Sequence, residues 1–302
     1  MPASPSQAPA WLSDVLLLLV AIVWGSSYGL AKQSVALYPV LGFLAIRFCM
    51  TFVLLLPWLR NVASPEGRNA FKAGLPLGLI LLAVFMAETF GVMLTRASNA
   101  AFLISLCIIF TPLVEWLLLA RRPQSRTLIA AVISLFGAGL LTSGANLDFN
   151  LGDWLILLAA VLRACMMCMT KKLTEGKTMC TLTLTAVQGG VVGFGSVVTA
   201  MLVLPGGLPA LPSAMAFWYN TVYLVLFCTI FAFFAQNWGV RRSSPTRVSL
   251  LMGSEPLFGA LFAVILLGEK LSAAAWLGGV MIVAASLWMT LPQRTAPVTQ
   301  AV

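Results

Sequence analysis

The chain contains no histidine and few charged residues, and both shortages exclude common kinds of protein. Without histidine it lacks the usual general base, pH switch and zinc ligand. Only 9% of its 302 residues are charged and 60% are hydrophobic, whereas about 25% of an ordinary soluble domain is charged. Such a chain cannot cover a soluble core with polar surface, and it is too apolar to be disordered. The composition therefore predicts a polytopic membrane protein.

Acidic residues are scarce as well, since 9 Asp and Glu stand against 18 Lys and Arg and leave a formal charge of +9. The basic residues lie in short loops between apolar runs, which indicates membrane topology and not nucleic-acid binding. With the N-terminus placed in the cytoplasm, thirteen basic residues fall on the cytoplasmic side and three on the opposite side. We therefore expect both termini in the cytoplasm, an even number of spans and no nucleic-acid partner.

The six cysteines lie mostly within apolar segments, so we expect small buried side chains and no disulfide framework. A Cu(I) site at Cys165 and Cys168 is the alternative, because soft sulfur ligands suit that ion and the two residues share a helix face. No histidine or acidic residue accompanies the pair. We expect no metal and no cofactor.

Ten continuous apolar runs indicate membrane-spanning helices, each of which needs about 20 residues. The runs lie at residues 12–31, 39–59, 71–94, 98–120, 127–144, 152–171, 180–204, 215–238, 246–267 and 273–291. They lack the alternation of membrane β-strands. The first run is too long for the core of a signal peptide, so we expect it to be retained as the first span. The sequence therefore predicts an all-α integral membrane protein with ten transmembrane helices.

The two halves of the chain resemble each other. Asp14 precedes Lys32 by 18 residues in the first span, and Asp153 precedes Lys171 by 18 in the sixth. The Thr-Pro-Leu triplet at 111–113 likewise resembles Glu-Pro-Leu at 255–257. We expect repeats at residues 1–147 and 148–302, inverted relative to each other because each holds an odd number of spans. Inverted repeats with a site near the midplane are typical of transporters.

Apart from Asp14 and Asp153 at the starts of spans, three carboxylates lie within the predicted spans, where a charge at the centre costs at least about 2.5–3.5 kcal/mol. Glu255 lies near mid-membrane beside Pro256, so we expect a kinked or broken helix there. It is a candidate proton acceptor or contact for a substrate amine, or else a structural carboxylate. Glu88 is a second candidate for proton exchange, or a structural partner of an arginine. For Glu115 we favour snorkelling toward the arginines at 121 and 122.

Two arginines also lie within spans. Arg163 occupies the position of Trp24 in the repeat, and it is a candidate contact for a substrate carboxylate or a permanent partner of a glutamate. For Arg47 we favour a structural pair. Polar and aromatic side chains complete the predicted substrate site, which comprises Trp24, Ser27, Tyr28, Asn99, Arg163, Tyr223, Gln236 and Glu255. Asn99 could instead cap a helix, and lining of a cavity by Tyr223 is as plausible as a structural role.

Several motifs occur in order along the spans. They are VWGSS at 23–27, FLAIRF at 43–48, RASNAAFL at 96–103, TPL at 111–113, SEPLFG at 254–259 and LGEK at 267–270. With them the sequence resembles the drug/metabolite transporter superfamily, specifically its ten-span EamA-type exporters. The resemblance implies two inverted five-helix halves around a central cavity, and export of small metabolites such as amino acids without nucleotide, often driven by protons.

The preferred hypothesis is therefore a secondary transporter in the inner membrane that exports a small amphipathic solute by alternating access. Amino acids or their analogues are the favoured cargo, and Glu255 or Glu88 is the favoured proton-coupling residue. Alternatives are export of drugs or cationic dyes, flipping of a lipid-linked carrier, and membrane-bound catalysis, for which no nucleophile–base set is present. We expect the small-molecule substrate and the lipid bilayer as partners, and a monomer or homodimer.

Overall fold

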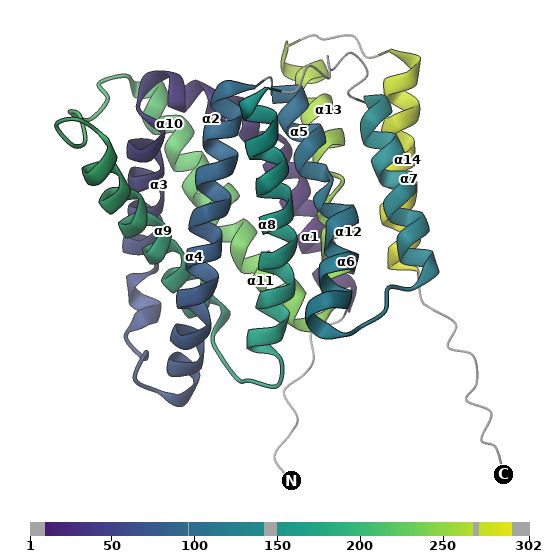
Figure 1. Cartoon of the computed structure of the whole chain (residues 1–302), viewed down its shortest axis with the longest axis horizontal. Helices are drawn as coiled ribbons and strands as arrows, with labels where there is room; N and C mark the ends of the chain where they lie inside the picture. Colours follow the sequence, from purple (N-terminus) through teal and green to yellow (C-terminus); the bar gives the residue numbers. More distant parts are fainter. Residues whose placement is uncertain (1–9, 96, 142–149, 268–271, 292–302) are drawn as a thin grey trace.

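The computed structural model describes residues 10–95, 97–141, 150–267 and 272–291. Every regular element in these ranges is a helix (Figure 1), which confirms the all-α prediction. The helices are α1 (Ala10–Gly25), α2 (Ser27–Leu37), α3 (Val40–Leu55), the 3₁₀ turn η1 (Leu56–Leu59), α4 (Pro65–Leu94), α5 (Ala97–Ser105), α6 (Cys107–Leu119), α7 (Ser125–Leu141), α8 (Leu151–Thr174), α9 (Thr181–Val203), α10 (Met215–Val225), the π-helical η2 (Leu226–Phe231), α11 (Ala232–Arg242), α12 (Pro245–Met252), α13 (Glu255–Leu267) and α14 (Ala273–Thr290).

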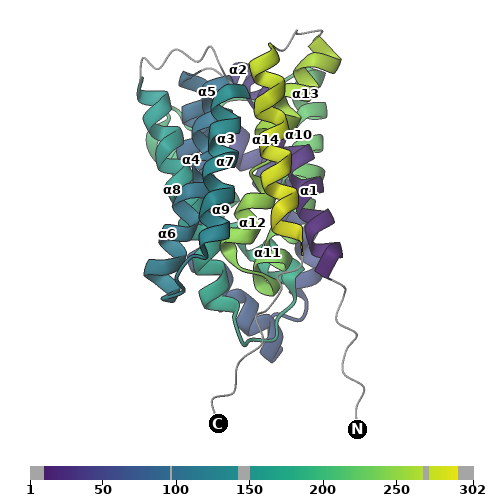
Figure 2. The same ribbon diagram turned by 90° about the vertical axis from the view of Figure 1, so that its right-hand side faces the viewer.

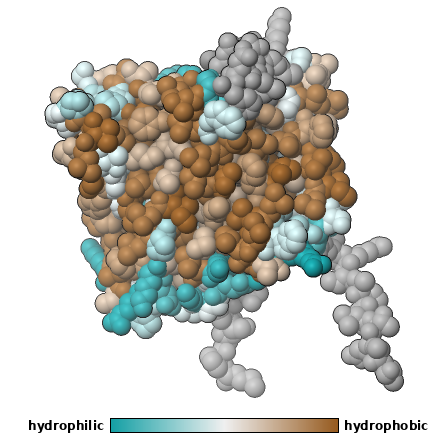
Figure 3. Space-filling view, viewed as in Figure 1, coloured by the Kyte–Doolittle hydropathy of each residue, from teal (hydrophilic) through white to brown (hydrophobic). Residues whose placement is uncertain are grey.

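The helices run roughly parallel to one another and present an apolar outer surface. Six of the described spans are long and apolar enough to cross a membrane, and the bent pair α1–α2 brings the number to seven. Two further helices, α7 and α14, are apolar but shorter. Figure 3 shows a broad apolar belt on the face in view, with hydrophilic side chains gathered along its lower edge. Within the described residues, each predicted run falls on one of the helices or on consecutive helices. The chain is a helical membrane protein.

The connections α3–α4, α6–α7, α8–α9 and α11–α12 lie at the lower end of the molecule in Figure 1, where α1 also begins and α14 ends. These connections and the helix ends that adjoin them contain most of the basic residues. The connections at the opposite end contain few. The basic residues therefore gather at one of the two ends of the helix bundle.

Several of these helical segments are interrupted near their middle. A bend of 40° at Ser26 separates α1 from α2, and the hydroxyls of Ser26 and Ser27 donate to the carbonyls of Val23 and Trp24. The break before Pro256 was predicted and is confirmed, because α12 ends at Met252 and α13 begins at Glu255. In a membrane, such breaks persist where the freed backbone groups are buried in protein or line a cavity.

Glu115 does not snorkel to the nearby arginines, so that interpretation is wrong. Its carboxylate is buried and accepts hydrogen bonds from the backbone amide and the hydroxyl of Thr246, at the start of α12. Arg121 donates instead to exposed Glu175, at 2.7 Å, and this hydrogen bond lowers the pKa of Glu175. The amide at a helix start offers a buried carboxylate a closer donor than an arginine in the loop.

The helices α7 and α14 pack side by side along one edge of the molecule (Figures 1 and 2). Glycines permit this contact. A Cβ atom added at Gly137 would lie 2.6 Å from the carbonyl oxygen of Gly278. The small-residue faces of the two helices therefore bring their backbones together, as is common between membrane helices.

We expect Gly137→Ala to lower the thermal unfolding temperature of the purified protein in detergent by several degrees. The added methyl meets backbone, and overpacking of this kind costs about 1–3 kcal/mol, which outweighs the gain of about 1 kcal/mol from replacing a helical glycine by alanine. The matched control is Gly139→Ala on the same helix, where the nearest atom, Phe102 Cε2, lies at an ordinary 3.7 Å. Equal unfolding temperatures for the two variants would contradict the close contact.

Candidate binding cavity

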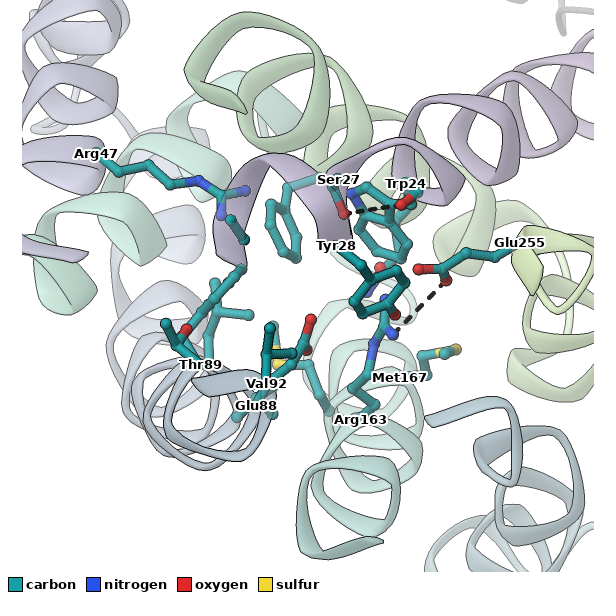
Figure 4. A pocket seen from close by; sticks show the side chains of 17 residues that line it. Trp24, Ser27, Tyr28, Arg47, Glu88, Thr89, Val92, Arg163, Met167 and Glu255 are labelled. Carbon is teal, nitrogen blue, oxygen red and sulfur yellow. Dashed lines mark hydrogen bonds and ion pairs between the residues drawn. The ribbon is translucent and has the colours of Figure 1, made fainter. Parts of the chain in front are cut away.

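A cavity lies among the helices within the apolar belt, and Figure 4 shows it from close by. It comprises about 690 Å³ when the space open at its mouth is included. Its lining is Trp24, Ser27, Tyr28, Ala31, Arg47, Leu81, Val84, Phe85, Glu88, Thr89, Val92, Arg163, Met166, Met167, Phe233, Gln236 and Glu255. Aromatic and aliphatic walls thus surround two arginines and two glutamates.

An ion pair between α8 and α13 forms one wall of this cavity. The Arg163 Nη1 and Glu255 Oε2 atoms are 3.7 Å apart, and their side chains are 12% and 7% exposed. This distance is longer than a charge-assisted hydrogen bond, which is about 2.7–2.9 Å. The two groups therefore neutralise each other without being locked together. Such a loose pair can admit a water molecule or a charged substrate group between its members.

Trp24 covers the other face of the Arg163 guanidinium. The guanidinium carbon lies 4.4 Å from the centre of the indole ring, which is a cation–π geometry. The indole N–H donates to the carbonyl oxygen of Cys228 at 2.9 Å, which fixes the ring. That carbonyl belongs to the π-helical turn η2, where the i→i−4 bonding of an α-helix is interrupted. The π turn thus provides the acceptor that positions Trp24 over Arg163.

Arg47 lies on the opposite side of the cavity from Glu255 (Figure 4). Its Nε donates to the Thr229 hydroxyl at 2.9 Å, and an Nη donates to the carbonyl of Cys228 at 3.4 Å. The rings of Phe48 and Phe85 lie 5.5 and 5.2 Å from its guanidinium carbon. Within the described residues its partners are a hydroxyl, a carbonyl and aromatic rings instead of the carboxylate that a structural ion pair requires.

Two polar groups border the open space of the cavity. The Tyr28 hydroxyl is buried and faces the Glu255 carboxylate, without a hydrogen bond of standard geometry. The Glu88 carboxylate, on α4, lines the cavity, and no described cationic group lies within 4.0 Å of it. Both side chains lie beside the space that Arg163 faces (Figure 4). A bound solute or water can therefore satisfy them.

Seven residues predicted from sequence come together in this cavity: Trp24, Ser27, Tyr28, Glu88, Arg163, Gln236 and Glu255. Tyr223 is not part of the lining; its hydroxyl hydrogen-bonds to Ser26 at 2.8 Å. Asn99 belongs to α5, but its side chain lies outside the described part of the structure. The roles of these residues in binding or coupling stay predictions.

Sequence reasoning missed several wall residues that a repeat or a helical period would have indicated. Met166 and Met167 follow Ser27 and Tyr28 by 139 residues, which is the offset between Asp14 and Asp153. On α4 the lining residues Leu81, Val84, Phe85, Glu88, Thr89 and Val92 recur at intervals of three and four, as one face of a helix does. Locating Glu88 on that helix would thus have indicated the rest of its face.

Cys168 packs as a small buried side chain. Its thiol faces the carbonyl of Thr111 at 3.7 Å. Across residues 10–95, 97–141, 150–267 and 272–291, no group of three or more His, Cys, Asp or Glu side chains is arranged to hold a metal ion.

The helical membrane scaffold and its polar cavity are those of a transporter, and comparison with known proteins gives the family. The sequence profile of the EamA-like transporter family matches residues 11–143 and again residues 150–291. The chain therefore belongs to this family, which is part of the drug/metabolite transporter superfamily.

Two curated relatives and one solved structure extend over nearly the whole chain. The "Uncharacterized inner membrane transporter YedA" of Escherichia coli K12 is 30% identical over 93% of this chain and 91% of its own length. The "Threonine/homoserine exporter RhtA" of Salmonella typhimurium is 25% identical over 98% of this chain and 97% of its own. A crystal structure matches with a TM-score of 0.75 at 16% identity, covering 93% of this chain and 98% of that one. This last likeness concerns the fold alone.

We expect Arg163→Met to destabilise the protein more than the double substitution Arg163→Met/Glu255→Gln. Loss of one member of a buried ion pair leaves an uncompensated charge and costs about 3–5 kcal/mol, whereas the double variant removes both charges of the pair. Thermal unfolding in detergent measures the difference. The deficit of the single variant should be smaller in acidic than in alkaline buffer, because protonation removes the charge on Glu255. Equal unfolding temperatures for the single and double variants would show that the two groups are not coupled.

Proposed function

We propose that this protein is a secondary transporter that exports small amphipathic metabolites, amino acids first among them, by alternating access. The observation that supports this proposal is the loose Arg163–Glu255 pair on the wall of a cavity inside the apolar belt. A charged pair at this depth is costly. A transporter that must receive a charged solute from either side has a use for it.

The proposed architecture is ten transmembrane helices in two inverted five-helix repeats, residues 1–147 and 148–302. The two matches of the family profile support it. Trp24 and Arg163, which contact each other, differ by the same 139 residues as Asp14 and Asp153. Equivalent positions of two repeats meet where the repeats are related by a two-fold axis. The cavity then lies at the junction of the halves, as in other transporters built from inverted repeats.

The contacts at the ends of the helices support the same symmetry. Lys32, in α2, donates to the carbonyl of Thr95 at the end of α4. Lys171, near the end of α8, donates to the carbonyl of Arg241 at the end of α11. In the proposed repeats, both lysines end the first span of their half and cap the C-terminus of the third. A lysine at a helix C-terminus is favourable for the exposed carbonyls there.

We infer that the face of the basic connections is cytoplasmic, so that both termini of the chain lie in the cytoplasm. Positive charge collects on the cytoplasmic side of bacterial membrane proteins, and the connections and adjoining helix ends at the lower end in Figure 1 contain most of it. The inner membrane is the proposed location, in keeping with the printed name of the Escherichia coli relative.

The chemistry of the cavity suits a zwitterion with an apolar side chain. Arg163 offers a guanidinium to a carboxylate, and Glu255 and Glu88 offer carboxylates to an ammonium group. Trp24, Tyr28, Phe85 and Phe233 supply aromatic surface. The Salmonella typhimurium relative named as a threonine/homoserine exporter supports amino acids as the first class to test.

We propose proton antiport as the coupling, through Glu255 or Glu88. A carboxylate in the cavity can hold either a proton or the ammonium group of a substrate, so the two compete. Competition of this kind couples inward proton flow to outward solute flow, because each carboxylate must exchange one for the other. The arginines cannot take this role, since they stay protonated.

The Glu255→Gln variant should lose the pH dependence of transport while it still binds substrate through Arg163 and Glu88, since the amide keeps the shape of the side chain but does not titrate. Efflux of radiolabelled amino acids from proteoliposomes at two pH values measures the first property, and calorimetric titration of the purified protein measures the second. Glu175→Gln, an exposed residue outside the cavity, is the control and should behave as wild type. If the flux through Glu255→Gln kept the pH dependence of wild type, Glu255 would not be the proton-coupling residue.

Export of flat cationic drugs is the second candidate, because the unpaired Glu88 and the aromatic walls would also suit a cation. A lipid-linked carrier is less suited to a cavity lined by four ionisable side chains.

Strains that overexpress the protein should tolerate toxic amino acid analogues better than strains that express the Arg163→Met variant, because the latter lacks the contact for a carboxylate. The measurement is growth on graded concentrations of such analogues and, in parallel, of cationic dyes. If the strains tolerated only the dyes, cationic drugs and not amino acids would be the substrates.

A further inference from the structure

A second, smaller cavity lies behind the Arg163–Glu255 pair. It comprises about 280 Å³ when the space open at its mouth is included, and it shares Trp24, Arg163, Met167 and Glu255 with the first cavity. Figure 4 places Met167 and Glu255 on the side away from Glu88 and Arg47, so the second cavity extends sideways from the first. Its remaining lining is Ile104, Ser105, Cys107, Ser249, Met252, Gly253 and Pro256. We call it the side pocket.

Beyond the shared ion pair, the side pocket has apolar walls without free polar groups. Its two serine hydroxyls are engaged within their own helices: Ser105 donates to the carbonyl of Phe102 at 2.6 Å and Ser249 to that of Thr246 at 2.9 Å. Ile104, Cys107 and Met252 are buried and face the same space. Away from Arg163 and Glu255, the side chains of this lining therefore favour an apolar group over one that must donate and accept hydrogen bonds.

The side pocket is formed where two helical segments are interrupted. One wall comes from the junction of α5 and α6, and the other from the junction of α12 and α13. Ser105 and Ser249 differ by 144 residues, the same offset as Thr111 and Glu255, so equivalent positions of the proposed repeats line the pocket from two sides. The interruptions leave space between the four helices that continuous packing would fill.

We propose that the side pocket is the subsite for the apolar side chain of the substrate, with the charged groups of the substrate held at Arg163, Glu255 and Glu88 in the first cavity. This assignment rests on the proposed function and deepens it, because it selects amino acids with an apolar side chain over small or polar ones. A ligand that spans both cavities passes the four residues that they share, Trp24, Arg163, Met167 and Glu255. The side pocket thereby recognises the size of the substrate's side chain, and the ion pair recognises its charged groups.

The test compares binding of L-alanine, L-leucine and L-phenylalanine to the purified full-length protein by calorimetric titration. Cys107→Leu narrows the side pocket without touching the first cavity. We expect it to weaken binding of leucine and phenylalanine by about tenfold or more, as lost fit of a few carbon atoms does, while alanine binds as to wild type. Cys165→Leu makes the same change on α8 at a half-buried position that lines neither cavity, and it should leave all three affinities unchanged.

A second variant keeps the test decisive should Cys107→Leu fold poorly. Met252→Ala widens the side pocket, and it should raise the preference for phenylalanine over alanine relative to wild type. Equal losses for all three amino acids in Cys107→Leu, together with an unchanged preference in Met252→Ala, would overturn the side-chain subsite and leave the proposed function standing. Failure of the wild-type protein to bind any of the three would contradict amino acids as cargo, and the subsite with them.

Discussion

The loose ion pair between Arg163 and Glu255 is the interaction on which the candidate site depends. Two charges buried in a membrane protein are stable only if they neutralise each other and find further partners. Here the arginine also has the indole of Trp24 on its other face. A tighter pair would be a structural cross-link that no solute could open. At 3.7 Å the pair still offsets the cost of burying both charges, yet its members stay available to a zwitterion.

Interrupted helices place the polar groups of this site. A continuous helix satisfies its own backbone and offers a membrane cavity only side chains. The junctions α1–α2, α5–α6 and α12–α13 instead bring loosened backbone close to the cavities, and serine hydroxyls at 26, 27, 105, 249 and 254 bond back to carbonyls of the preceding turn. These bonds let the chain bend without exposing unpaired backbone groups to the apolar surroundings. The same bends create the space that the two cavities occupy.

Much of the fold was predictable because the bilayer acts on whole helices. Long apolar runs in the sequence fall on the observed helices, and the costly charges Glu88, Arg163 and Glu255 all line the cavity. Contacts that depend on where a side chain points around its helix were less predictable. Glu115 bonds to the start of α12 because the tertiary fold brings a helix N-terminus to it, and sequence distance alone favoured Arg121.

The partners of Trp24 and Arg47 were not predictable for a related reason. Both donate to Cys228, whose carbonyl is available because residues 226–231 form a π turn. The sequence LFCTIF has no proline or glycine to mark this turn. Tertiary packing decides between a π turn and an α-helical turn here. A prediction based on the helical period of 3.6 residues therefore gives this segment the i→i−4 hydrogen bonds of an α-helix.

The π turn at η2 has a consequence for how this span can change over evolution. A π turn holds one residue more than an α-helical turn, so the residues that follow it are rotated relative to those before it. Phe233 and Gln236 reach the cavity from α11, beyond the turn, while Thr221 and Leu224 face the core from α10 before it. Deletion of a single residue within 226–231 would restore regular winding, turn the whole of α11 by about 100°, and at once withdraw the shared acceptor from an indole and a guanidinium. We therefore expect the number of residues in this segment to be under stronger selection than the identity of any side chain in it.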